Sequence, residues 1–134
     1  MKPKILIVDD DADLVELLQV WFEGNGIDVT VCTDPLNAVN EATANEPDMI
    51  IIDVYMAGLS GFDVARLLKK EHETADIPIL FISARMDIET ASNAFMVGAM
   101  DVLKKPVDLH SLLQKAKPLL DFSKVHKLIK EILH

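Results

Sequence analysis

ILIVDD at residues 5–10 and MIIID at residues 49–53 are two apolar runs that end at carboxylates, the first at Asp9 and Asp10, the second at Asp53. Apolar runs of this length between helical patterns are typical of buried strands in a parallel sheet. Ligands of such sheets bind where the strands end at their carboxyl side. The sequence therefore predicts an acidic pocket at that edge of a sheet.

Strand-like and helix-like patterns alternate five times along the 134 residues, which predicts one α/β domain of βα units. We expect strands at residues 5–8, 27–31, 49–52, 77–82 and around 102–103. Asp34 and Asp87 are expected to cap intervening helices, and Asp108 the last core helix. The helix faces expected to point inward contain Leu14, Leu17, Leu18 and Trp21, then Leu36, Val39 and Ala42, and then Phe62, Ala65 and Leu68.

The C-terminal segment is expected to be extra to these units. Pro118 is expected to end or kink the last core helix, and Ser123 to cap a further amphipathic helix. We therefore divide the chain into a domain over residues 1–118 and a helix over residues 119–134. Its apolar stripe must pack on the domain, on a second copy or on an absent output module, and we favour a connector, dimer or partner helix.

Charge and composition exclude several classes of function. Residues 1–103 hold 19 acidic against 6 basic side chains, so we expect no nucleic-acid binding through this part of the chain. No apolar stretch is long enough to span a membrane, and the N-terminus lacks the apolar core of a signal peptide. The expected location is therefore the cytoplasm. The single cysteine, Cys32, is expected to be a buried apolar residue.

Five polar groups follow the predicted strands and are expected to meet at one edge: Asp9, Asp10, Asp53, Ser83 and Lys105. Three carboxylates packed together repel one another unless a cation or a proton neutralises them. Oxygen ligands with open positions suit Mg²⁺, which is commonly shared with a phosphate. The sequence predicts a Mg²⁺ site at this edge.

A carboxylate beside Mg²⁺, with a lysine and a hydroxyl in reach, is suited to phosphoryl transfer. Asp53 is the expected nucleophile. Asp10 is expected to bind the metal directly and Asp9 mainly through water. The backbone carbonyl of Tyr55 is the expected further ligand.

At these residues the chain closely resembles the receiver domain of two-component response regulators, over about residues 3–118. The resemblance implies a flavodoxin-like, doubly wound (βα)5 fold with strand order 2-1-3-4-5, and often a cis bond before the proline that follows the lysine. The matching segments are Ile5 to Asp10, Asp53 to Gly61, Ile82-Ser83-Ala84, Gly98-Ala99 and Lys105-Pro106.

The resemblance also implies a function. A histidine kinase or phosphotransfer protein is expected to donate a phosphoryl group to Asp53 in a Mg²⁺-dependent step, and hydrolysis later removes it. The expected output is a conformational change sensed by a downstream effector or an absent output domain. Beyond this self-catalysed chemistry the chain is not expected to be an enzyme. Neither nucleic acid nor a membrane is an expected partner of this domain, and a homodimer is an open option.

The chain departs from the family pattern at several positions near this site. Val102 stands where the family has an aromatic residue that moves inward on phosphorylation, and a valine side chain cannot make that movement. Ala57 replaces a usual proline. Tyr55 and Arg85 occupy positions that tune water access in the family, and we hypothesise that they slow hydrolysis.

Two alternatives to this function come from other classes. A metal-dependent phosphatase of the haloacid dehalogenase type also uses an aspartate nucleophile, but it needs a second aspartate two residues later, where this chain has Tyr55. The other alternative is an interaction module that is not phosphorylated. It is disfavoured because the carboxylates, the hydroxyl and the lysine are all present.

Overall fold

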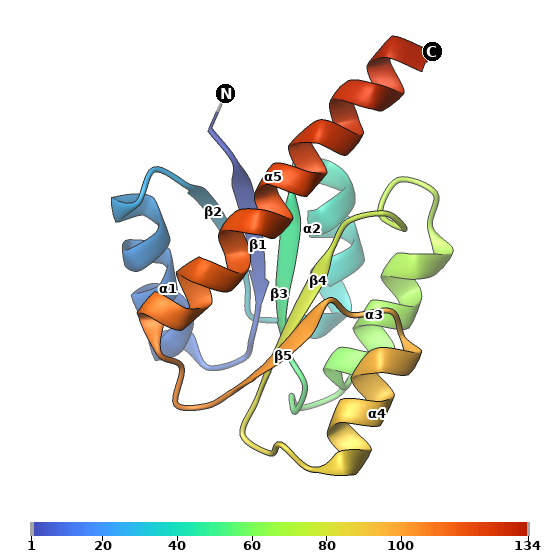
Figure 1. Cartoon of the computed structure of the whole chain (residues 1–134). Coiled ribbons are helices and arrows are strands. Elements are labelled where there is room, and N and C mark those ends of the chain that lie inside the picture. Colours follow the sequence, from blue (N-terminus) through green and yellow to red (C-terminus); the bar gives the residue numbers. More distant parts are fainter. Residues whose placement is uncertain (1, 134) are drawn as a thin grey trace.

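Five strands form one parallel sheet in the order β2-β1-β3-β4-β5 in the computed structural model, which describes residues 2–133 (Figure 1). This order and the parallel pairing confirm the predicted flavodoxin-like topology. Each strand lies within about two residues of its predicted position. The strands are β1 (Lys4–Val8), β2 (Asp28–Cys32), β3 (Met49–Asp53), β4 (Ile79–Ser83) and β5 (Asp101–Lys104).

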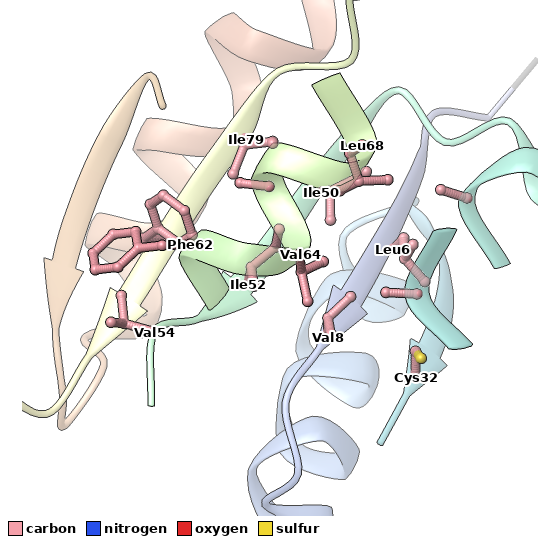
Figure 2. Packing of buried hydrophobic residues seen from close by; sticks show 14 of the residues in the cluster. Leu6, Val8, Cys32, Ile50, Ile52, Val54, Phe62, Val64, Leu68 and Ile79 are labelled. Atoms are coloured by element: carbon pink, nitrogen blue, oxygen red, sulfur yellow. The ribbon is translucent and has the colours of Figure 1, made fainter. Parts of the chain in front are cut away.

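Helices cover both faces of this sheet, so the central strands are buried on both sides (Figure 1). Because side chains alternate along a strand, Ile5 and Ile7 pack with α1 and α5, while Leu6 and Val8 face the opposite layer. Figure 2 shows Leu6 and Val8 among the buried hydrophobic residues on that opposite face of the sheet. The helices are α1 (Ala12–Gly24) and α5 (Leu109–Leu133) on one face, and α2 (Ala38–Asn45), α3 (Gly61–Lys70) and α4 (Ile88–Met96) on the other.

Side-chain caps fix where several helices begin. The carboxylate of Asp87 accepts a hydrogen bond from the backbone N–H of Thr90, which confirms the predicted cap of α4. Asp34 caps a short 3-10 turn over Pro35–Asn37, and α2 begins only after that turn. Both predicted aspartates therefore act as caps, but Asp34 caps the 3-10 turn that precedes α2 and not α2 itself.

Two predicted inward-facing residues are exposed. Leu17 is 51% and Leu36 72% exposed, so both predictions were wrong. The buried stripe of α1 contains Val15, Leu18 and Phe22, which is rotated by about one position from the predicted stripe. Leu36 lies in the 3-10 turn, whose different residue spacing removes it from the buried face of α2.

The last helix, α5, continues through Pro118 to Leu133, so of the two predicted effects of Pro118, a helix end or a kink, the helix end was wrong. A proline inside a helix removes one backbone hydrogen bond, but Leu120 and Ser123 beyond it are buried against the domain and hold the helix in place. Ser123 is therefore an interior residue and not an N-cap. Residue 134 of the predicted helix lies outside the described residues. Neither α5 nor any other helix within residues 2–133 is apolar enough to cross a membrane.

Candidate functional site

The carboxyl ends of β1 and β3 bring three aspartates together. Asp9 and Asp10 directly follow β1, and Asp53 is the last residue of β3, which lies beside it in the sheet. One carboxylate oxygen from each lies within 4.8 Å of the others. Asp9 and Asp53 are buried, whereas Asp10 is exposed. The site is therefore an acidic cluster with one side open to solvent.

Backbone groups hold two of these carboxylates in place. Asp9 Oδ1 accepts a hydrogen bond from the N–H of Asp11 at 2.9 Å. Asp10 Oδ2 accepts one from the N–H of Ala57 at 3.0 Å. Because Ala57 lies in the loop after β3, the second bond ties that loop to the end of β1. The two acidic strand ends are therefore positioned relative to each other by their own loops.

Gly61, the first residue of α3, allows that helix to approach β3. Its N–H donates to the carbonyl of Val54 at 2.8 Å. A Cβ atom at this position would lie 2.3 Å from the backbone oxygen of Asp53, a distance that no methyl group tolerates. Gly61 ends one of the segments that carry the family resemblance, but its close contact with β3 is visible only when the strand and the helix are placed together.

Lys105 extends its ammonium group into the acidic cluster. Its Nζ lies 3.0 Å from Asp9 Oδ2 and 3.3 Å from Asp53 Oδ2. The backbone N–H of Lys105 donates to the carbonyl of Ser83 at 2.8 Å, which continues the pairing of β4 and β5 beyond the strand ends. The peptide bond between Lys105 and Pro106 is cis, as the resemblance implied.

Ser83, at the end of β4, is fully buried at the same edge. Its Oγ accepts a hydrogen bond from the backbone N–H of Arg85 at 3.1 Å. The structure therefore places the five predicted site residues at one edge of the sheet. Among the described residues, the side-chain contacts that join them link Lys105 to Asp9 and Asp53, while the Ser83 hydroxyl bonds to the following loop.

The environment of Asp53 opposes its negative charge. Burial and the neighbouring carboxylate of Asp9 raise the pKa of Asp53 to about 6, although Lys105 acts in the opposite direction. Burial also disfavours the ammonium of Lys105, but Asp9 and Asp53 outweigh that effect and raise the pKa of Lys105. One lysine therefore only partly compensates the carboxylates around it.

The residues of this cluster fit a hard divalent cation. Asp9 Oδ2 is buried and makes no hydrogen bond of good geometry, although the ammonium of Lys105 lies 3.0 Å away. That oxygen retains lone-pair capacity inside an all-oxygen donor set formed with Asp10 and Asp53. Carboxylate oxygens with open positions are the ligands that Mg²⁺ prefers. The cluster is therefore a candidate metal site.

Tyr55 and Arg85, each two residues after a site residue, contact each other. The guanidinium of Arg85 lies 5.5 Å from the centre of the Tyr55 ring and 2.6 Å from Asp87. The Tyr55 hydroxyl lies 3.1 Å from Thr90 Oγ1, a buried hydroxyl on α4. Tyr55 and Arg85 were predictable from the family resemblance, whereas Thr90 was not, because nothing in the spacing of a helical threonine points to a strand end.

Val102, on β5, is half-buried. Its side chain packs against the hydrophobic core on the face of the sheet that α2, α3 and α4 cover. Beside it lies a shallow hollow of about 390 Å³, which Phe95 and Met100 also line. A second hollow, about 930 Å³, lies at the opposite, amino edge of the sheet, and none of the predicted site residues lines it. The acidic cluster meets solvent through Asp10, whereas Asp9 and Asp53 are buried.

A doubly wound parallel sheet with an acidic cluster, a lysine and a serine at its carboxyl edge defines a class of flavodoxin-like proteins. The family model described as the response regulator receiver domain matches residues 5–117. The chain belongs to this family, and it is the receiver domain of a two-component response regulator.

Curated relatives share this domain but are longer. The chain is 35% identical over 118 residues to the DNA-binding dual master transcriptional regulator RpaA of Synechocystis sp., covering 88% of this chain and 49% of that protein. It is 31% identical over 117 residues to the DNA-binding response regulator MtrA of Mycobacterium leprae, covering 87% and 51%. The chain therefore spans about half the length of the curated relatives it matches.

Solved structures show the same fold. The receiver domain of the Francisella response regulator 1452 is 30% identical, with a TM-score of 0.84 and coverage of 91% of this chain and 99% of that chain. The chemotaxis protein CheY4 of Vibrio cholerae is 25% identical, with a TM-score of 0.85 and coverage of 89% and 99%.

Proposed function

We propose that the chain accepts a phosphoryl group on Asp53 and thereby carries a signal from a histidine kinase or phosphotransfer protein. The observation that carries this proposal is the contact of one lysine ammonium with both Asp9 and Asp53, inside a cluster that also contains Asp10. The family membership of residues 5–117 supports the same function.

The transfer step follows from the chemistry of a carboxylate nucleophile. The Asp53 carboxylate attacks the phosphorus of a phosphohistidine donor, so an oxygen–phosphorus bond forms while the bond from phosphorus to the donor's nitrogen breaks. The donor imidazole leaves with the electron pair and takes up a proton. Lys105 supplies positive charge at 3.3 Å from Asp53, where phosphoryl oxygens arrive.

Asp9, Asp10, Asp53 and the backbone carbonyl of Tyr55 are the residues that would hold Mg²⁺. When bound, Mg²⁺ supplies positive charge that offsets the carboxylates and the phosphoryl oxygens. Ser83 offers a hydroxyl donor at the same edge, because its Oγ accepts from the backbone N–H of Arg85 and its own O–H remains able to donate. Signal output then passes to an effector, either a separate protein or a domain outside this sequence, as the longer DNA-binding relatives suggest.

A small phosphoryl donor tests this proposal. We expect the chain to gain one phosphoryl group from phosphoramidate in the presence of Mg²⁺, measured by intact mass, and to lose it in acid. Asp53→Ala and Asp10→Ala should not be labelled, while Asp28→Ala, an exposed residue on β2, should be labelled like wild type. Wild-type labelling of Asp53→Ala in an acid-labile linkage would show that the acceptor is a different residue.

A further inference from the structure

Four side chains in the segments after β3 and β4 form a closed ring of contacts. The Arg85 guanidinium donates to Asp87 Oδ2 at 2.6 Å and lies 5.5 Å from the centre of the Tyr55 ring. The Tyr55 hydroxyl lies 3.1 Å from Thr90 Oγ1, and the backbone N–H of Thr90 donates to Asp87 Oδ1 at 2.8 Å. We call Tyr55, Arg85, Asp87 and Thr90 the contact ring. Each of its members contacts two others.

Two members of the contact ring come directly after residues of the acidic site. Tyr55 lies two residues after Asp53, and Arg85 lies two residues after Ser83. The backbone N–H of Arg85 also donates to Ser83 Oγ at 3.1 Å. A change in the position of the Ser83 hydroxyl therefore acts directly on the backbone of Arg85.

The other two members fix the beginning of α4. Asp87 is its N-cap, and Thr90, in its first turn, is only 1% exposed. Thr90, mainly through its backbone N–H, and Arg85 lower the pKa of Asp87 to about 2. The carboxylate that caps α4 is therefore ionised at neutral pH, and it is shared between the helix and the guanidinium.

We propose that the contact ring transmits the phosphorylation state of Asp53 to α4, an inference that rests on the proposed function. A phosphoryl group on Asp53 brings charged acceptor oxygens to which the free O–H of Ser83 donates. Because Ser83 Oγ also holds the backbone of Arg85, its movement draws Arg85 away from Tyr55 and Asp87. The capping carboxylate then loses its counter-charge, and the first turn of α4 loosens.

The strand beside α4 offers a poorer route. Val102 on β5 packs in the hydrophobic core, and its short branched side chain has few rotamers between which to switch. Its contacts are apolar and tolerate small displacements. The contact ring consists of hydrogen bonds, an ion pair and a cation–π contact, which weaken when their geometry changes. A small movement at one member therefore reaches the next.

Amide hydrogen exchange over α4 (Ile88–Met96) of the full chain, with and without the phosphoryl group, tests this proposal. Phosphoramidate and Mg²⁺ supply the group, and intact mass measures its uptake in each sample. Labelling should speed exchange of α4 in the wild type by about threefold or more. Thr90→Val replaces the buried hydroxyl with a methyl group of similar size and retains the backbone N–H. This variant should take up the same amount of phosphoryl group, but the ratio of labelled to unlabelled exchange rates should fall to about 1.

Two further threonine variants serve as controls. Thr90→Ser retains a hydroxyl and should restore the response of α4 to labelling. Thr43→Val is the matched control, because the Thr43 hydroxyl donates to the carbonyl of Val39 within α2, and its response should equal that of the wild type. A merely structural role of the Thr90 hydroxyl would change exchange equally with and without the phosphoryl group.

The outcomes separate this proposal from the proposed function. A wild-type ratio in Thr90→Val, or unchanged exchange of α4 in labelled wild type, would overturn the contact ring as the route to α4 and leave phosphorylation of Asp53 intact. A wild type that gains no phosphoryl group would overturn the proposed function, and this inference with it.

Discussion

Asp53 combines two properties that rarely occur together, since it is buried and it faces a second buried carboxylate. Its side chain is 5% exposed, and the nearest counter-charge, Lys105, is shared with Asp9. An ionised carboxylate in such a place destabilises the folded protein, as the raised pKa of Asp53 indicates. The same arrangement favours binding of a cation, because a cation removes the repulsion.

We predict that Asp53→Asn stabilises the protein when divalent cations are chelated. The pKa of Asp53 lies at about 6 in the folded protein against an ordinary value of 3.8, so the folded state holds the proton more tightly between these values. The wild type therefore loses stability as the pH rises from about 4 to 6. The gain in Asp53→Asn should be absent at pH 4 and reach about 1–3 kcal/mol above pH 6.

Urea unfolding at several pH values in a chelator measures this gain. Asp28→Asn is a suitable control, because Asp28 is an exposed residue far from the cluster, and its effect should stay within about 0.5 kcal/mol. A gain that does not depend on pH, or a loss of stability above pH 6, would contradict the electrostatic account of Asp53.

Tyr55 and Arg85 are predicted to shield the phosphorylated Asp53 from water. Their contact at 5.5 Å, and the bond of the Tyr55 hydroxyl to Thr90, hold the two side chains together two residues beyond Asp53 and Ser83. We expect Tyr55→Ala and Arg85→Ala each to speed dephosphorylation by about threefold to tenfold, or roughly 0.7–1.4 kcal/mol of barrier. Decay of the labelled protein measures this rate.

Arg66→Ala is the matched control for Arg85→Ala, because Arg66 also forms an exposed pair with an aspartate but lies on α3. Its decay rate should equal that of the wild type. The shielding hypothesis is wrong if both site variants decay at the wild-type rate or more slowly.

Residues at strand ends were predictable from sequence, whereas their partners on helices were not. Asp9, Asp53 and Lys105 each follow an apolar run, and parallel strands necessarily bring their carboxyl ends to one edge. Thr90 and Gly61 lie on helices, and their contacts depend on how close α4 and α3 approach the sheet. Such distances are set by packing of the whole layer, which a local sequence pattern does not contain.

Among the elements, α5 shows most clearly where local rules fail. Proline has a strong tendency to end helices, and that rule predicts a break at Pro118. The helix continues because Ala116 and Leu120 on either side of the proline are buried against the sheet. Tertiary packing therefore outweighs the loss of one hydrogen bond. The cap of α4 at Asp87 was predictable because capping involves only neighbouring residues.

We predict that Asp76 holds the distal half of α5 on the domain. Asp76 Oδ2 accepts a hydrogen bond from Lys130 at 3.0 Å and lies 3.6 Å from His126 Nε2. Asp76→Asn should make amide hydrogen exchange over residues 124–133 about twofold to fivefold faster, the scale expected for exposed ion pairs. Exchange in β1 and β3 should not change.

The pH dependence gives a second readout of the same contact. The hydrogen bond from Lys130 holds the pKa of Asp76 below its usual value, so the contact persists above that range and is lost as the pH falls through the lowered pKa. The difference in exchange between wild type and Asp76→Asn should therefore vanish in strong acid. Equal protection of the two proteins at neutral pH would show that the contact does not hold the helix.

On the scale of the whole molecule, the acidic cluster and the distal half of α5 lie at opposite edges of the sheet. The acidic cluster lies at the carboxyl edge, whereas α5 crosses one face of the sheet and its distal half reaches loops at the amino edge (Figure 1). Five of the 13 basic residues lie on α5, whereas Lys105 lies in the acidic cluster.

The fold as a whole was predictable because several short sequence patterns all indicate the same α/β architecture. Five alternating strand and helix patterns allow only a few right-handed topologies, and the family resemblance selected the order 2-1-3-4-5 among them. The orientation of α5 was not predictable, because both sides of its distal half carry regular patterns. Only the contacts of Lys127 and Lys130 with the domain show which side faces outward.

Reduction of the phosphorylated chain with borohydride shows directly whether Asp53 accepts the phosphoryl group. Borohydride converts an aspartyl phosphate to homoserine, which peptide mass spectrometry locates in the sequence. The account predicts homoserine at position 53 alone, and only after incubation with both Mg²⁺ and the donor. Homoserine at another aspartate, or equal amounts at position 53 without Mg²⁺, would contradict it.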